Sequence, residues 1–382
     1  MIGDNNNWPL MRLSECCVSI ADGDHQPPPK ADSGVPFVTI SNIVSNKFDF
    51  SDTMFVPMAY YESLDSKRKA KAGDILYSVV GSFGIPVFID DNVPFVFQRH
   101  IAILRPSPDI ILPKFLYYSM LSHKFYQMAD AAAVGAAQRT VSLTALRNMK
   151  IGVPDLATQQ KIIDVLAPYD DLIATNQKQI SLLEEAAQRI YKEWFIDFHF
   201  PGHESASYED GVPAGWRKGI LAEIAAFKRG KTITKDETSE GSIPVIAGGL
   251  TPAYYHNQSN TAAPVITVSG SGANAGFTRM YHEKVWASDC SFVDIDTTKA
   301  FHFVYCFIKA NVHQINNLQK GAAQPHVYAK DLNKLEVLIP IKSVQDGFTN
   351  TVKPFFDKIG ILEKQNVFAE NARTRLLREL LG

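Results

Sequence analysis

The stretch GAAQRTV at Gly135–Val141 returns as GAAQPHV at Gly321–Val327, 186 positions further along the chain. The same offset holds without a gap for roughly fifty residues, a period far above that of solenoid repeats. The matched pairs include Pro154 and Pro340, Gln159 and Gln345, Pro168 and Pro354, Asp171 and Asp357, and Arg189 and Arg375. A repeat of this length predicts a duplicated domain.

Upstream of this motif the two halves share much less. Trp8 corresponds to Trp216 at an offset of 208, so the first half is 22 residues longer between its Trp and its GAAQ motif. The one further agreement is Val80-Gly81-Ser82 against Ser269-Gly270-Ser271. The sequence therefore predicts a variable globular domain followed by a shared segment, twice over.

The globular part of each half shows short runs rich in Val, Ile and Phe, bounded by Gly, Pro, Asp or Asn, which predict β-strands. In the first half these runs are Val35–Ile40, Asp74–Val80, Pro86–Ile89 and Phe95–Leu104. The patterns at Lys114–Met128 and Ala300–Leu318 predict helices. We therefore expect a mixed α+β domain in each half.

The end of each half carries one apolar stripe at three- and four-residue steps, which predicts long helices at residues 158–198 and 343–381. About forty residues make a rod of roughly 60 Å, with more apolar stripe than a small domain covers. The two helices should therefore pair with each other, antiparallel, between the globular domains.

Local signals refine these two helices. Thr158 and Ser343 lie at their starts and are candidate N-caps. Pro168 and Pro354 should break or kink each helix about one-quarter of the way along. The predicted fold class is thus α+β, with two mixed domains, two long antiparallel helices and a pseudo-two-fold internal repeat.

The composition is that of a globular protein, with 46% hydrophobic and 20% charged residues and a net charge of −2. No apolar run is long enough to span a bilayer, and residues 1–8 resemble neither a signal nor a transit peptide, so we expect a cytoplasmic protein. Cys16, Cys17, Cys290 and Cys306 lack metal-ligand spacing, and we expect reduced thiols and no metal.

The distribution of charge limits how the chain can bind nucleic acid. Residues 1–150 and 201–340 are each neutral, whereas residues 151–200 carry four Lys and Arg against eight Asp and Glu. Proteins that hold DNA by charge alone are basic over a whole face. DNA binding here would need local patches, or partners that supply positive charge.

The junction between the halves carries WFIDFHFPGHE at Trp194–Glu204, followed by VPAGW at Val212–Trp216. This pattern resembles the junction between the central conserved region and the second target recognition domain of type I restriction-modification DNA specificity subunits. Pro154–Gln160, with its Pro and Gln-Gln pair, is similar to the start of that family's conserved helix. The second helix has Gln345-Asp346 instead of Gln-Gln, and the second half lacks the WFxDF ending.

The resemblance covers nearly the whole chain in architecture. It implies target recognition domains at residues 1–153 and 201–340, and conserved long helices at 154–200 and 341–382. It also implies a non-catalytic subunit without a cofactor of its own, whose two domains each recognise one half of a bipartite double-stranded DNA site. The helices would set the spacing and dock two modification subunits, which bring S-adenosylmethionine. Restriction subunits would bring ATP-driven translocation, with magnesium.

Two other function classes remain open from the residues alone, a DNA methyltransferase with degenerate motifs and a protein-only coiled-coil adaptor. No NPPY or DPPY run, which amino-methyltransferases use to hold a flipped base, occurs in the sequence. Gly230-Lys231-Thr232 resembles the end of a P-loop, but Ala225 replaces the earlier glycine, so we expect no nucleotide there. His199 and His203 have metal-like spacing, but a junction loop is favoured.

Candidate DNA contacts are polar residues beside strand ends, because Arg, Asn and Gln present paired groups that match base edges in the major groove. The cluster Lys67–Lys71 is either a phosphate contact or a solvated face, and Gly270–Gly276, like Gly81–Gly84, is either a tight turn or a loop close to DNA. Gln138–Thr140 is a stronger candidate because its loop occurs in both halves. The full set is Lys67, Arg68, Lys69, Ser82, Gln98, Arg99, His100, Gln138, Arg139, Thr140, Ser271, Asn274, Gln324 and His326.

The candidate subunit-interface residues are apolar positions of the two helical stripes. They are Ile162, Leu172, Leu183, Ile190 and Trp194 in the first helix, and Phe348, Phe355, Leu362 and Leu376 in the second. Helices of this kind bury their stripe against other helices.

Overall fold

The computed structural model describes residues 8–44, 46–51, 53–136, 138–321 and 324–382. It divides into two compact units, one made of Met1–Ile173 and Val367–Gly382, the other of Ala174–Asn366. Each unit combines one globular half of the chain with parts of both long helices. Ala137, Ala322 and Ala323 of the repeated motif lie outside the described residues.

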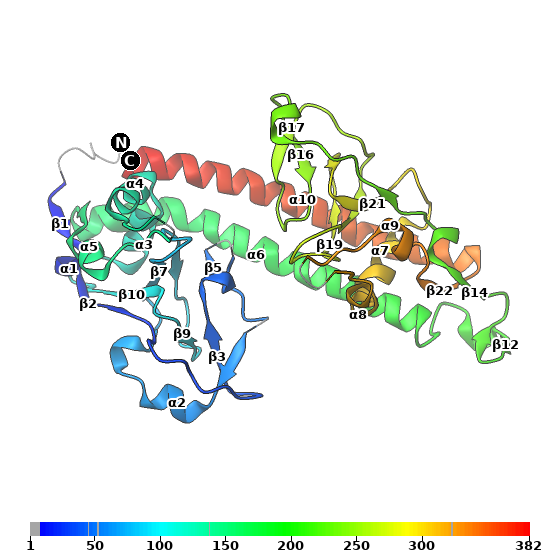
Figure 1. Cartoon of the computed structure of the whole chain (residues 1–382), viewed down its shortest axis with the longest axis horizontal. Coiled ribbons are helices and arrows are strands. Elements are labelled where there is room, and N and C mark those ends of the chain that lie inside the picture. The colour runs from blue at the N-terminus through cyan, green and yellow to red at the C-terminus, as the bar shows by residue number, and fades with distance from the viewer. Residues whose placement is uncertain (1–7, 45, 52, 137, 322–323) are drawn as a thin grey trace. The chain divides into compact units, whose positions relative to one another are not determined.

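The first unit is a mixed domain, and its short strands follow the predicted Val, Ile and Phe runs (Figure 1). Its strands are β1 (Leu10–Arg12), β2 (Cys17–Asp22), β3 (Val35–Val38), β4 (Ile43–Val44), β5 (Lys47–Phe48), β6 (Met54–Val56), β7 (Ile75–Ser78), β8 (Pro86–Phe88), β9 (Val96–Phe97), β10 (Ile101–Pro106) and β11 (Lys150–Gly152). Its helices are α1 (Leu13–Cys16), α2 (Met58–Ser63), α3 (Pro113–Leu121), α4 (His123–Ala132), α5 (Leu143–Asn148) and the first part of α6 (Leu156–Phe195).

The second unit shares most of this order, but its described residues contain no counterpart of helix α2 or of the β4–β5 pair, and it begins with an added pair, β12–β13. Its strands are β12 (Tyr208–Glu209), β13 (Val212–Pro213), β14 (Arg217–Ile220), β15 (Lys228–Arg229), β16 (Ile243–Ile246), β17 (Tyr254–His256), β18 (Val265–Ser269), β19 (Thr278–Tyr281), β20 (Trp286–Ala287), β21 (Cys290–Asp294) and β22 (Glu336–Ile339). Its helices are α7 (Phe301–Ala310), α8 (Val312–Asn317), α9 (Ala329–Leu332) and the first part of α10 (Lys342–Leu381).

Sheet topology confirms the duplication. The four-stranded sheet of the first unit has the order β2-β10-β7-β8, and that of the second has the matching order β15-β21-β18-β19. Each unit adds a three-stranded sheet in which the middle strand has one antiparallel and one parallel neighbour, β6-β3-β9 and β17-β16-β20. Two short pairs, β1 with β11 and β14 with β22, join the start of each half to its end.

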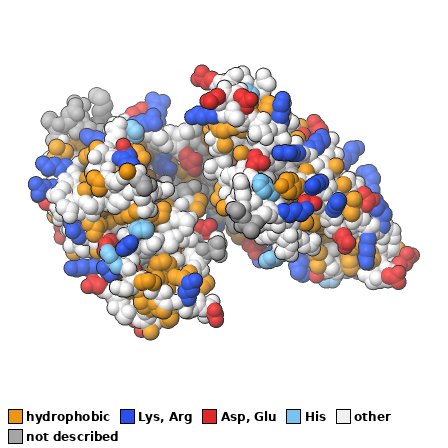
Figure 2. All heavy atoms as spheres, viewed as in Figure 1, with side chains coloured by type: hydrophobic (Ala, Val, Ile, Leu, Met, Phe, Trp, Pro, Cys, Tyr) orange, Lys and Arg blue, Asp and Glu red, His pale blue; other side chains and the backbone are white. Residues whose placement is uncertain are grey.

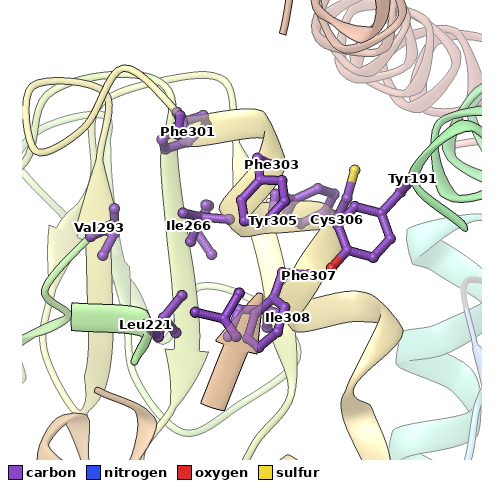
Figure 3. Packing of buried hydrophobic residues seen from close by; sticks show 14 of the residues in the cluster. Tyr191, Leu221, Ile266, Val293, Phe301, Phe303, Tyr305, Cys306, Phe307 and Ile308 are labelled. Atoms are coloured by element: carbon purple, nitrogen blue, oxygen red, sulfur yellow. The ribbon is translucent and has the colours of Figure 1, made fainter. Parts of the chain in front are cut away.

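Each unit has its own hydrophobic core. In the second unit, Phe301, Phe303 and Ile308 of α7 pack against Ile266 of β18 and Tyr191 of α6 (Figure 3). The first unit buries α3 and the start of α6 with the end of α10 in a corresponding cluster. The long helices are therefore part of the cores, which explains why their stripes are apolar.

The two long helices are confirmed, and parts of them lie side by side in each unit (Figure 1). In the second unit, Asn176 donates to Asn366 over 2.9 Å, and the rings of Trp194 and Phe348 lie 5.8 Å apart. Residue numbers rise along α6 as they fall along α10, so the pairing is antiparallel. In the first unit, Arg373 of α10 forms an ion pair with Asp170 of α6.

Of the break or kink expected at each proline, no break occurs, and the N-caps expected at Thr158 and Ser343 were wrong. No break occurs at Pro168 or Pro354, because both lie on the exposed side, where solvent can satisfy the carbonyl that each proline leaves without a partner. Thr158 is not the N-cap of α6. Asp155 is, and its carboxylate accepts from the Thr158 backbone N–H over 3.0 Å. Ser343 lies inside α10, which begins at Lys342.

Three predicted runs are divided in the structure. Phe95–Leu104 forms β9 and β10, which belong to different sheets and are joined by residues 98–100. Lys114–Met128 forms α3 and α4, because Ser122 adopts an extended backbone and its hydroxyl accepts from the Phe125 N–H. Ala300–Leu318 divides similarly at Asn311.

Candidate nucleic-acid interface

Three loops of the first unit converge at one end of the four-stranded sheet. The backbone N–H of Val79, just after β7, donates to His100 O over 2.9 Å, which ties this strand end to the β9–β10 link. Gly81 N donates to Arg139 O over 2.9 Å, and Val141 N donates to Val79 O over 2.8 Å. The predicted groups at Ser82, residues 98–100 and residues 138–140 therefore come from loops that lie together.

The second unit repeats this convergence bond for bond. Gly270 N donates to Asp289 O, Gly272 N to Pro325 O, and Val327 N to Gly270 O, over 3.0 to 3.1 Å. Val79 thus corresponds to Gly270, an offset of 191. The expected alignment of Val80-Gly81-Ser82 with Ser269-Gly270-Ser271 was therefore two residues off. It paired residues of similar type, whereas the backbone hydrogen bonds pair the two loops at a different offset.

Glycines make the convergence possible. Gly23 follows β2 and Gly230 follows β15, and a Cβ on either would lie 2.2 Å from a backbone carbonyl oxygen, Phe97 O or Ser288 O. Gly135 and Gly321 open the repeated motif with φ of 111° and 100°, a region that favours glycine. A fourth loop, after β2 or β15, therefore runs against the link between β9 and β10 or between β20 and β21 in each unit.

Residues 98–100 form the link between β9 and β10. The side chains of Gln98 and Arg99 make no hydrogen bond or ion pair with any described residue, while the Arg99 N–H donates to Asp24 O over 3.0 Å. Burial, followed by the charge of Arg99, lowers the pKa of His100 below its usual value, so its imidazole is neutral at neutral pH. This link offers open donors and acceptors on a fixed backbone.

Arg139, in the motif loop of the first unit, is held by two residues outside that loop, Asp130 and Phe83. Its guanidinium forms an ion pair with Asp130 over 2.5 Å and lies 5.3 Å from the ring centroid of Phe83. Phe83 in turn stacks on Tyr126, with centroids 6.1 Å apart. Gln138 is exposed beside it. Arg139 is therefore preorganised at the surface.

The second unit holds a different set of side chains on the same backbone. Ser271 donates a hydrogen bond from its hydroxyl to the carboxylate of Asp289, and the ring of His326 stacks on Tyr328 with centroids 5.8 Å apart. Gln324 is exposed, and the Asn274 side chain has no hydrogen-bonding partner among the described residues. The two units therefore present different chemistry from matching loops.

A groove of similar size lies beside the glycine-rich turn in each unit. It has a volume of about 510 Å³ in the first unit, where Gly84 and Tyr126 line it. In the second unit it has about 430 Å³ and is lined by Gly276, Asn274 and Val312. Tyr126 and Val312 stand at the 186-residue offset.

The basic cluster of the first unit is only partly free. Arg68 lies 3.7 Å from Asp22, and the Lys69 ammonium donates to Glu62 O over 2.7 Å and lies 5.3 Å from the Tyr61 ring centroid. Lys67 is exposed. Lys and Arg side chains are interspersed with Asp and Glu over the visible face of each unit (Figure 2).

Sequence reasoning missed the loop after β2 and β15. Lys231 is exposed in this loop, Lys228 and Arg229 are exposed in β15 itself, and the Lys231 backbone N–H donates to Ala287 O over 2.9 Å. The signal that could have identified this loop is the glycine shared by positions 23 and 230, at an offset of 207. The comparison with a P-loop used Gly230 alone. Within the described part of the chain, no α-helix begins directly after Gly230, as a phosphate cradle would require.

Most of the nine candidate subunit-interface residues on the long helices pack within this chain. Ile162, Phe348 and Leu362 are buried in it, and Leu183, Ile190, Trp194, Phe355 and Leu376 are half-buried. Leu172 is the most exposed of the nine, at 44%. Contact of these residues with another subunit stays a prediction.

The structure also accounts for the junction between the two halves of the chain. Phe195, Phe198 and Phe200 of the junction pack on Trp216, with centroids 5.2 to 5.8 Å apart. The described residues contain no group of three or more His, Cys, Asp or Glu placed to hold a metal ion. Among the described helices, none is long and apolar enough to cross a membrane.

Comparison with known proteins identifies relatives over most of the chain. Residues 5–185 and 213–370 match the family described as type I restriction modification DNA specificity domain. The specificity subunit of the type I restriction enzyme HindI from Haemophilus influenzae is 28% identical over 208 residues, which cover 52% of this chain and 43% of that protein. The putative MjaX specificity subunit from Methanocaldococcus jannaschii is 23% identical over 98% of this chain and 93% of its own length.

A solved structure has the same fold. The S subunit of a type I restriction-modification system from M. genitalium superposes with a TM-score of 0.58 at 17% identity, over 100% of this chain and 98% of that one. At this identity the likeness shows the fold alone.

Proposed function

This chain belongs to the type I restriction-modification DNA specificity family, and from that premise we propose that each unit recognises one half of a bipartite DNA site. The chain acts as the non-catalytic DNA-binding subunit of a cytoplasmic complex. Methyl transfer from S-adenosylmethionine, and ATP- and magnesium-dependent translocation, belong to modification and restriction subunits.

One observation carries this proposal, the identical backbone convergence of loops that differ in side chains. Val79, Gly81 and Val141 are bonded as Gly270, Gly272 and Val327 are, yet Arg139 stands where the second unit has Pro325. Base recognition depends on side-chain groups placed on a rigid backbone. Two such platforms with different side chains suit two different half-sites.

Charge supports the involvement of partner subunits. Both globular blocks are neutral, so counterion release from DNA phosphates contributes little affinity. The segment 151–200 is acidic and is better placed against protein than against DNA. We propose that two modification subunits dock on the long helices and supply further phosphate contacts.

Exchange of one recognition domain tests the proposal. Residues 1–150 are replaced by the corresponding domain of a relative, and the methylated motif is determined by sequencing genomic DNA of cells that carry the complex. We expect one half-site to change while the other half-site and the spacer remain. A matched exchange of residues 201–340 should change only the other half. If either exchange altered both half-sites, the units would not act separately.

A further inference from the structure

Asp289 is a carboxylate placed among the converging loops of the second unit. Its backbone O accepts from Gly270 N over 3.1 Å, and its side chain, which is half-buried, accepts the Ser271 hydroxyl. It forms no ion pair with any described residue, although Lys228 and Arg229 of β15 and Lys231 of the following loop are exposed in the adjoining segment. The carboxylate is therefore oriented by a neutral donor and keeps accepting capacity.

The first unit has the opposite chemistry at this place. His100 corresponds to Asp289, because each carbonyl accepts from the matching strand-end N–H, that of Val79 or Gly270. Arg99 precedes it, with a guanidinium that makes no ion pair within the described residues. The first platform thus presents a guanidinium and a neutral imidazole where the second presents a carboxylate.

A carboxylate in a DNA-facing loop has few useful partners. The phosphate backbone repels it, and it can only accept hydrogen bonds. Base edges in the major groove offer two donors, the N4 amino group of cytosine and the N6 amino group of adenine. Guanine and thymine present only acceptors, or a methyl group, at the same edge.

We infer that Asp289, positioned by Ser271, is a specificity-determining residue that accepts from the exocyclic amino group of cytosine or adenine in the second half-site. This inference rests on the proposed function. The exposed Lys228, Arg229 and Lys231 contact the neighbouring phosphates and offset the repulsion of the carboxylate.

Selection of bound duplexes from a randomised library tests this with the assembled complex of full chain and modification subunits. In D289N one acceptor oxygen remains, which the Ser271 hydroxyl can use, and the other becomes a donor NH2 group. The base preference at one or two adjacent positions of the second half-site should therefore change or fall by roughly tenfold or more. The first half-site and the spacer should remain. S271A should weaken preference at the same position, and S271T, which keeps the hydroxyl, should behave as the unaltered chain.

Asp296→Asn is the matched control, because Asp296 is an exposed Asp beyond the opposite end of β21. It should leave the selected sequence unchanged. If D289N selects the unaltered second half-site, or only binds all DNA more tightly, the inference is overturned. Should D289N fail to fold, an unchanged selection by S271A overturns it instead. A starting complex that selects neither half-site would overturn the proposed function itself.

Discussion

Insertion of four residues into each long helix should lengthen the unspecified spacer of the DNA site and leave both half-sites unchanged. Asn176 of α6 pairs with Asn366 of α10, so the insertions belong just after Asn176 and just before Asn366. Placed there, the added segments face each other and the Asn176–Asn366 hydrogen bond is kept, whereas the longer contact of Asn176 with Gln365, at 3.4 Å, is lost.

The magnitude follows from helix and duplex geometry. Four residues at 1.5 Å add roughly 6 Å and a net rotation of about 40°. Duplex DNA rises about 3.4 Å and turns about 35° per base pair. The added length therefore corresponds to one or two base pairs, and the added rotation to about one.

Methylome sequencing of cells that carry each variant reports half-sites and spacer together. Insertion into α6 alone is the control. It would shift Trp194 by about one helical turn against Phe348, whose rings now lie 5.8 Å apart, and should lower stability without giving a longer spacer. A stable double insertion with the original spacer would show that the helices do not set the distance, and altered half-site bases would show that they affect recognition instead.

Three further outcomes are expected. N176A should lower the free energy of unfolding, measured in urea, by about 1–3 kcal/mol, because Asn366 loses a buried hydrogen-bonding partner. N176L/N366L, which removes both polar groups, should restore the lost stability, and an equal loss in both variants would contradict this reasoning. Burial lowers the pKa of His302 to about 4, so its folded state favours neutral imidazole, and stability should fall as pH drops from about 6.5 to about 4. H302F, which can still stack on Phe356, should reduce that acid loss by up to about 3 kcal/mol in urea titrations, and an unchanged pH profile would exclude His302 as its source. The isolated chain should bind DNA weakly and scatter light as aggregates, and modification subunits should correct both; nanomolar binding by the chain alone would contradict this.

Periodicity predicted the long helices to within a few residues, because their apolar stripes pack into the cores of both units. Periodicity failed where a local hydrogen bond ends a helix although the apolar pattern of the sequence continues. Ser122 caps α4 in the middle of an apolar helical run, and Asp155 takes the cap expected at Thr158. Pro168 shows the converse, since a helix tolerates proline where the freed carbonyl faces solvent.

The candidate site was predictable only in part. The repeated motif identified Gln138–Thr140 and its counterpart, because the two copies keep one offset. Their meeting with residues 98–100 was not predictable, since it depends on hydrogen bonds between distant segments, from Val79 N to His100 O and from Gly81 N to Arg139 O. Asp289 was missed because its partner, Ser271, lies on a different strand end.

The converging loops are joined largely through main-chain atoms, and this bears on how new specificities arise. Val79, Gly81 and Val141 contribute N–H groups, and His100 and Arg139 contribute carbonyls, so these bonds persist whatever side chains are present. We therefore expect substitution of exposed residues there to cost the fold little while it changes the groups available for binding. Glycines 23 and 230 are the exception, because any Cβ would collide with a carbonyl oxygen. In such a platform the exposed side chains can therefore change readily, whereas the two glycines cannot.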